Sequence, residues 1–260
     1  MNVNLTMNTL QELLFFPLKD AESRKKLFVA SAIEFAGFII PIIPRLFVLG
    51  YAGEIARQII VKKEEPHMPE WENWSEYLSF GAKLFGVYII YAIPMLLPMF
   101  AAYFIMMLPG IVEIFNDSRH AYGTPALPPE WMMFSTFGGM ILFGLGMLFS
   151  LFLFVFLPPA MSHVVAKDSF AAGFSIREWW KIFRENLGGF ILSMVVTGGL
   201  YMVLMLVIQL VYMTIILCCL LPFLLSFVMA YMNIVVFTLF AQAYRDGQEK
   251  LKLQPIIQSQ

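Results

Sequence analysis

The charged residues in the second half of the chain are confined to one short island. Between Trp131 and Ala243 only seven residues are charged, and all seven lie between Lys167 and Glu185. The apolar sequence on either side is longer than a soluble helix can bury, whereas a membrane-spanning helix needs roughly 20 such residues. The pattern therefore predicts an all-α integral membrane protein, whose helices satisfy their own backbone hydrogen bonds within the lipid.

Five apolar stretches set the expected organisation. They are residues 27–49, 84–108, 132–157, 190–211 and 214–241. We expect a polytopic helical protein with four to five spans and interfacial amphipathic helices, forming a single membrane domain over residues 1–260. Its expected parts are an interfacial N-terminal segment (1–26), a first hydrophobic half (27–108) with a loop at 66–74, a second hydrophobic half (132–243) with an interfacial helix at 175–187, and a polar tail (244–260).

The first apolar stretch is interrupted. Glu34 lies within it, Pro41 and Pro44 break it, and Arg45 follows at once. If the stretch crosses the membrane once, the basic N-terminal cluster lies opposite the other basic loops. If it re-enters, every Lys and Arg except Arg119 lies on one side, as the positive-inside rule favours. Re-entry is the favoured prediction, and it requires a turn that is covered by protein or lined by water.

Glu34 is the one ionisable residue within these stretches that suggests activity. A carboxylate at membrane depth is costly and usually faces protein or water. Glu34 and its neighbour Arg45 therefore form a candidate ion or proton site. In the alternative interpretation Glu34 lies at a shallow depth and pairs with Lys26 or Arg57.

The charged island predicts a helix in the plane of the lipid head groups. Trp179 and Trp180 fall on one face of this helix, opposite its basic side chains, which suits an interfacial anchor. Four basic residues are candidate contacts for anionic lipid: Lys167, Arg177, Lys181 and Arg184. The alternative is an elbow that only orients the adjacent spans.

The most distinctive segment reads Pro69-Glu70-Trp71-Glu72-Asn73-Trp74. Pro69 ends the preceding helix, and the indoles of Trp71 and Trp74 prefer the boundary between lipid and water. Pro69, Glu70, Trp71 and Trp74 are therefore candidate interface or anchor residues. They serve either as a structural anchor or as a recognition surface for a partner protein.

This segment, following a proline-interrupted apolar helix, resembles the hallmark of the DUF4013 family of prokaryotic integral membrane proteins. The family pattern is Leu-Pro-Glu/Asp-Trp-Asp-Asp-Trp/Phe, and this chain departs from it at Met68, Glu72 and Asn73. The resemblance covers residues 13–245 and is strongest over residues 27–85. It implies a multi-pass protein of the prokaryotic cytoplasmic (inner) membrane. The family has no established activity, so the resemblance implies an architecture and little chemistry.

The sequence offers little for catalysis. It contains no His-x-x-x-His, Cys-x-x-Cys or Gly-x-Ser-x-Gly pattern and no glycine-rich phosphate loop, since Gly138, Gly139, Gly144 and Gly146 lie within an apolar span. We therefore expect no catalytic, cofactor or metal site and no enzymatic activity. The net charge of −1 gives no basis for nucleic-acid binding.

The expected function is that of a non-catalytic scaffold, an accessory subunit of a larger membrane assembly or a homo-oligomer. Its expected partners are the lipid bilayer, anionic lipids, and other membrane subunits or further copies of itself. The alternative is a small transporter or channel that uses the broken first segment and Glu34.

Overall fold

The computed structural model describes residues 7–116, 127–214 and 219–257, and all regular structure within these ranges is helical. The elements are α1 (Met7–Phe15), η1 (Phe16–Leu18), α2 (Ala21–Ala36), α3 (Ile43–Arg57), η2 (Gln58–Lys62), α4 (Trp74–Asn116), α5 (Pro129–Lys167), η3 (Phe170–Phe174), α6 (Ile176–Glu185), α7 (Leu187–Met213) and α8 (Leu221–Ile257). This confirms the all-α prediction. Arg119 lies outside the described residues.

Four helices are long and apolar enough to cross a membrane, namely α4, α5, α7 and α8. Each exceeds the roughly 20 residues that a bilayer core requires. The chain is therefore a multi-pass membrane protein. The last helix, α8, continues through most of the predicted polar tail and ends at Ile257.

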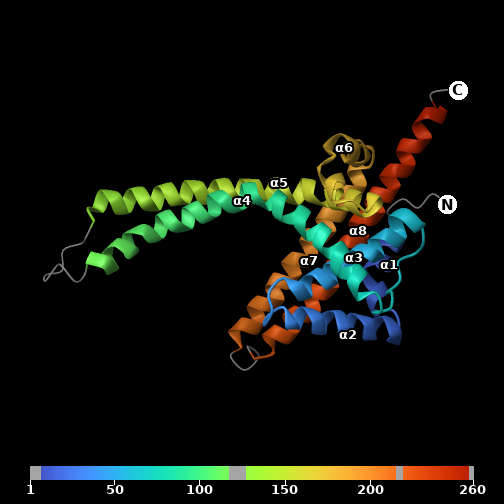
Figure 1. The fold of residues 1–260 in the computed structure, drawn as a ribbon, viewed down its shortest axis with the longest axis horizontal. Coiled ribbons are helices and arrows are strands. Elements are labelled where there is room, and N and C mark those ends of the chain that lie inside the picture. Colours follow the sequence, from blue (N-terminus) through green and yellow to red (C-terminus); the bar gives the residue numbers. More distant parts are fainter. Residues whose placement is uncertain (1–6, 117–126, 215–218, 258–260) are drawn as a thin grey trace. The chain divides into compact units, whose positions relative to one another are not determined.

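The chain divides into two compact units (Figure 1). Unit 1 comprises Met1–Val87 and Pro158–Gln260, and unit 2 comprises Tyr88–Leu157. Helix α4 begins in unit 1 and helix α5 ends there, and together they supply the described helices of unit 2.

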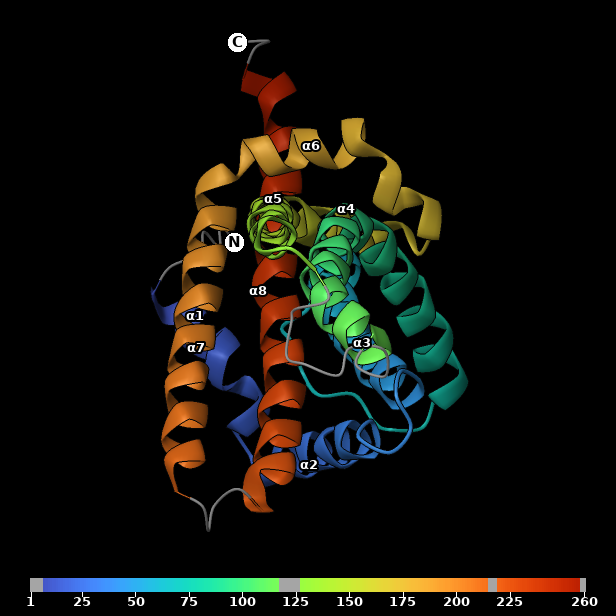
Figure 2. The same ribbon diagram turned by 90° about the vertical axis from the view of Figure 1, so that its left-hand side faces the viewer.

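Helix α8 is the centre of unit 1. It contacts α1, α2, α3, α6 and α7, and Figure 2 shows α7 beside it with α6 lying across it. Ala230, Ala241 and Ala243 on α8 are fully buried. Small side chains let neighbouring helices approach closely, which is how packed membrane helices gain contact area.

The first apolar stretch folds as two short helices. Helices α2 and α3 are both packed against α8, and the chain between them runs from Gly37 to Ile42. Pro41 lies in this break and Pro44 lies in the first turn of α3, where a missing N–H is harmless. The predicted proline break is thus confirmed, whereas re-entry into the membrane stays a prediction.

The break contains a strained turn. Ile42 has a φ of 79° and a ψ of −66°, and the Ile43 N–H donates to the Pro41 carbonyl at 3.1 Å. These values describe a γ-turn with positive φ, which is rare and unfavourable for a β-branched residue. The side chains from Phe38 to Ile43 are exposed in unit 1, so re-entry would require this turn to be lined by water or covered from outside the unit.

Helices α3 and α4 cross with their backbones in contact. A Cβ atom added at Gly50 would lie 1.8 Å from the Tyr77 carbonyl oxygen. One added at Gly81 would lie 1.8 Å from the Leu46 carbonyl oxygen. Only glycine permits this approach, and the crossing fixes the start of α4 against the first half of α3.

Unit 2 is a pair of helical arms from α4 and α5. Gly139 faces Met106, and Gly146 faces Met99, so glycines of one helix receive methionines of the other. The most apolar windows of α4 and α5 are only 11% and 6% buried. Their remaining surface has the composition that lipid or an apolar partner helix would cover.

Candidate functional site

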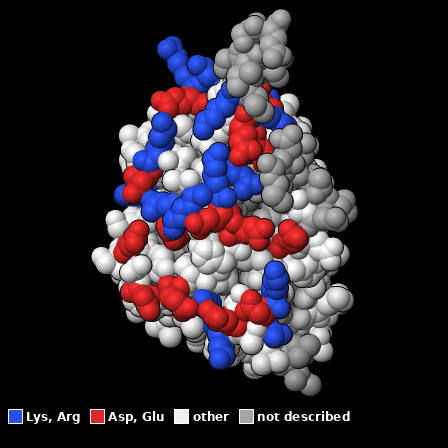
Figure 3. Space-filling view, turned by 90° about the vertical axis from the view of Figure 1, so that its right-hand side faces the viewer, with Lys and Arg blue, Asp and Glu red and all other residues white. Residues whose placement is uncertain are grey.

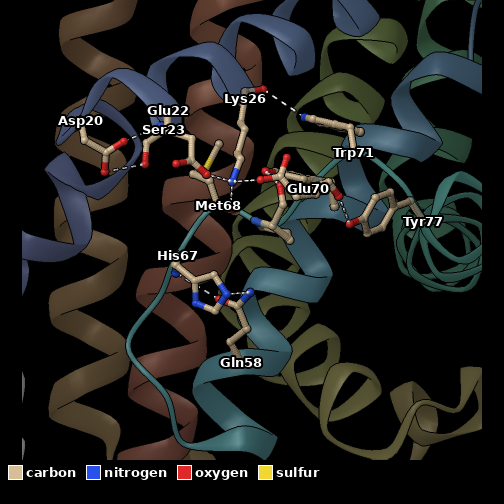
Figure 4. A network of polar contacts seen from close by, with 12 residues as sticks. Asp20, Glu22, Ser23, Lys26, Gln58, His67, Met68, Glu70, Trp71 and Tyr77 are labelled. Carbon is tan, nitrogen blue, oxygen red and sulfur yellow. Dashed lines mark hydrogen bonds and ion pairs between the residues drawn. The ribbon is translucent and has the colours of Figure 1, made fainter.

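The segment between α3 and α4 is held by a partly buried lysine from α2 (Figure 4). The Lys26 ammonium donates to Glu22 at 2.7 Å and to the Met68 carbonyl at 2.9 Å, and it pairs with Glu70 at 2.7 Å. Its side chain is 12% exposed. Burial lowers the pKa of Lys26, but the hydrogen bonds to Glu22 and Glu70 outweigh burial and raise it. The ammonium is therefore charged at neutral pH and anchors the segment.

Aromatic side chains close the same segment. The Tyr51 and Trp71 rings stack with centroids 4.0 Å apart and planes 4° apart. Trp71 donates its indole N–H to the Lys26 carbonyl at 3.1 Å. The hydroxyl of Tyr51 donates to the Pro69 carbonyl at 2.8 Å. Trp71 thus has the apolar body and the polar partner that an indole requires when buried.

The four predicted anchor residues of this segment have different roles in the structure. Pro69 and Glu70 both accept hydrogen bonds through their carbonyl oxygens, Glu70 from the Tyr77 hydroxyl at 2.7 Å. Trp71 lies within the aromatic stack, whereas Trp74 is 42% exposed at the start of α4. Trp74 is thus the more exposed of the two indoles, and its contact with the lipid–water boundary stays a prediction.

A second polar cluster surrounds Arg57 at the end of α3. The guanidinium lies 3.2 Å from Glu54, 2.9 Å from Asp168 and 3.6 Å from Glu76. It also lies 4.4 Å from the centre of the Phe80 ring, within range of a cation–π interaction. Arg57 therefore joins α3 to the start of α4 and to the residue that follows α5.

Asp168 completes the cluster. Its carboxylate also binds Lys83 at 2.9 Å, and its backbone has a φ of 50°, a conformation that Asp tolerates better than most residues. Burial raises the pKa of Asp168, but the Lys83 hydrogen bond and the Arg57 charge outweigh it, and the pKa lies below the ordinary value of 3.8. Figure 3 shows one face of the molecule on which acidic and basic side chains also lie next to one another.

Glu34 and Arg45 come together, as the sequence suggested, and a third residue joins them. Glu34 is 5% exposed and accepts a hydrogen bond from the Asn233 amide at 3.1 Å. The Arg45 guanidinium lies 3.9 Å from the other carboxylate oxygen. Lys26 and Arg57, the alternative partners expected for Glu34, pair with other residues instead.

Helix α6 carries the remaining predicted residues. Trp179 is buried and donates its indole N–H to the Gly173 carbonyl at 3.2 Å, whereas Trp180 is half-buried and stacks on Phe183. Lys167 lies 3.9 Å from Glu178. Three basic side chains are exposed on the outer face of the helix: Arg177, Lys181 and Arg184. Trp179 thus fixes α6 to the protein, and contact with anionic lipid stays a prediction for the basic residues.

Comparison with known proteins identifies the family of this chain. The family model described as "Protein of unknown function (DUF4013)" matches residues 35–213. The chain belongs to the DUF4013 family. No curated protein and no solved structure matches it. The match includes α3, the segment before α4, and the charged cluster around Arg57, so these features lie within the family's region of this DUF4013 protein.

Several residues of these sites had no signal in the sequence. Asn233 is an isolated amide in an apolar helix, and Tyr51 is one aromatic residue among many. Asp168 follows α5 and lies far from Arg57 along the chain. Gly50 and Gly81 have no motif around them. A glycine on each of two consecutive apolar helices was the only signal that could have indicated the α3–α4 crossing of this DUF4013 protein.

Proposed function

We propose that this protein is a non-catalytic component of a membrane assembly, acting as a scaffold or accessory subunit through its helices. The observation that supports this most strongly is the use of the polar side chains in unit 1. Lys26, Arg57 and Trp71 direct their donors to groups of the same chain. Catalytic and transport sites need groups that remain available to a substrate, whereas these groups stabilise the fold.

The apolar helices support the same proposal. Only 11%, 6% and 17% of the apolar membrane-spanning stretches of α4, α5 and α7 are buried within the protein. Helices in lipid associate through close packing rather than through the hydrophobic effect, so large apolar faces can be shared with partner helices. We further propose that the assembly resides in the cytoplasmic membrane of a prokaryote, as the family resemblance implies.

Cross-linking within the membrane tests this proposal. A photoreactive residue placed at Ile141 on α5 or Met202 on α7 points away from the chain, since the native side chains are 72% and 73% exposed. We expect discrete adducts of constant mass, either with a second copy or with another membrane protein. The same residue at buried Leu84 or Ile234 should give no intermolecular adduct. Lipid adducts alone at every exposed position, with a monomeric mass in detergent, would contradict the assembly.

Glu34 supports one alternative, a small transporter or channel. A buried carboxylate that joins an amide of α8 to an arginine beside a broken helix resembles the discontinuous-helix sites of transporters. In the scaffold, Glu34→Gln should have little effect, because the amide occupies the same space and keeps one acceptor for Asn233. We expect liposomes with either protein to leak protons or cations no faster than empty liposomes.

The exposed Glu12 provides the control for that measurement. Flux through the wild-type protein that is lost in Glu34→Gln and kept in Glu12→Gln would establish the transporter in place of the scaffold. Flux that survives both substitutions would also contradict the scaffold, and it would place the pathway away from Glu34.

A further inference from the structure

A surface pocket of about 620 Å³ lies along the first turns of α4. Its lining includes two basic side chains, Arg57 and Lys83, and three acidic ones, Glu72, Glu76 and Asp168. All of these residues belong to unit 1. The acidic excess disfavours a simple anion, while the presence of both signs suits a ligand that carries both charges.

At one end of the pocket, two carboxylates are available to a ligand. Glu72 is exposed and has no ion pair within the described part of the chain. Glu76 is 57% exposed and only 3.6 Å from Arg57, which already has closer partners. The exposed indole of Trp74 lies between them in the sequence. Two carboxylates beside an aromatic ring that is 42% exposed are a favourable environment for an ammonium group.

At the other end, hydrogen-bond donors are available to a ligand. The Lys83 ammonium has three N–H donors, and Asp168 takes two of them, at 2.9 Å through its carboxylate and 3.3 Å through its carbonyl. One donor is left. The exposed Ser79 hydroxyl, one turn earlier on α4, has no hydrogen-bond partner among the residues described. An ammonium and a hydroxyl that line the same pocket one helical turn apart can together bind a phosphate.

The two ends are separated by a distance that fits a small zwitterion. Glu76 and Lys83 are two helical turns apart on one face of α4, which is about 10 Å along the axis. Both side chains line the same pocket. An ammonium and a phosphate joined by a two-carbon linker can therefore contact both ends.

The pocket also lies where α4 becomes apolar. Lys83 is the last charged residue before Glu113, and the apolar run begins at Leu84. The end of an apolar span is the level of the lipid head groups. We propose that this pocket binds the head group of a zwitterionic phospholipid, with the ammonium at Glu72 and Glu76 beside Trp74 and the phosphate at Ser79 and Lys83. This site is separate from the basic face of α6 and does not depend on the assembly proposed above.

Lipid retention measured by native mass spectrometry tests the site. The protein in detergent is mixed with equal amounts of phosphatidylethanolamine and phosphatidylglycerol that carry the same acyl chains. We expect the wild-type protein to retain phosphatidylethanolamine preferentially. The double variant Glu72→Gln/Glu76→Gln should lower that preference about tenfold, as the loss of a charge-assisted hydrogen bond implies.

The control is Glu64→Gln/Glu65→Gln, which removes the same charge from exposed residues outside the pocket. It should keep the wild-type preference, and both variants should melt at the wild-type temperature because all four side chains are exposed. Equal retention of the two lipids by the wild-type protein, or equal losses in both variants, would overturn the site. Displacement of the bound lipid by an equal concentration of free phosphoethanolamine would overturn its assignment to a lipid.

Discussion

Gly81→Ala is expected to destabilise unit 1 more than any other single methyl addition to α4. The new Cβ would lie 1.8 Å from the Leu46 carbonyl oxygen and 3.0 Å from the Gly50 amide nitrogen. Both neighbours are backbone atoms, so no side chain can rotate away, and α3 and α4 must separate. We expect a loss of about 3 kcal/mol or more, at the upper end for overpacking. The measurement is thermal or denaturant unfolding of the purified protein in detergent, together with the yield of monodisperse protein.

Gly198→Ala is the matched control. It makes the same substitution within a helix, but apart from the adjacent backbone of α7 itself no atom lies within 4 Å of the position that its Cβ would occupy. Alanine favours a helix over glycine by about 1 kcal/mol, so this variant should be as stable as the wild type or slightly more so. Equal stability of Gly81→Ala and Gly198→Ala would show that α3 and α4 do not cross as closely as described.

Arg57→Met is expected to have the second largest effect. Methionine keeps much of the aliphatic length, but it leaves Glu54 and Asp168 without their shared cation. Loss of one member of a buried ion pair costs roughly 3–5 kcal/mol. Here Lys62 still pairs with Glu54 and Lys83 with Asp168, so we expect about 2 kcal/mol in the same unfolding measurement. Arg24→Met, which removes an exposed arginine of α2, should cost less than about 0.5 kcal/mol.

The pH dependence of the Arg57 variant provides a second measurement. The pKa of Asp168 is lowered in the folded protein, so its contribution to stability is present above 3.8 and is lost as the pH falls through the lowered pKa. Without Arg57 the pKa of Asp168 should rise toward its ordinary value, and this acid-sensitive part of the stability should shrink. If the two proteins lose the same stability as the pH falls below 3.8, Arg57 does not act through Asp168.

The membrane class could be predicted from the sequence because it depends on composition over long windows. An apolar run of 20 or more residues cannot remain in water, so residues 84–108 and 132–157 had to become α4 and α5. The proline break was equally local, since Pro41 and Pro44 cannot continue a helix that precedes them. The anchoring segment was recognised by its unusual residue types. The role of each residue there was not predictable, because Tyr51 and Lys26 reach it from other helices.

The partners of each charged residue were decided only by the tertiary structure. Glu34 and Arg45 are close in sequence, and their proximity could be predicted, whereas Asn233 reaches Glu34 from a helix 199 residues later. The sequence determined that this is an all-helical membrane protein with a proline-broken first segment and charged connections between its helices. Only the fold decided that α8 is the centre of unit 1, that Gly50 and Gly81 set the α3–α4 crossing, and that Arg57 meets Asp168. The physical reason is range: hydrophobic transfer and proline geometry act within one segment, whereas packing and ion pairing depend on segments that meet only in the folded protein.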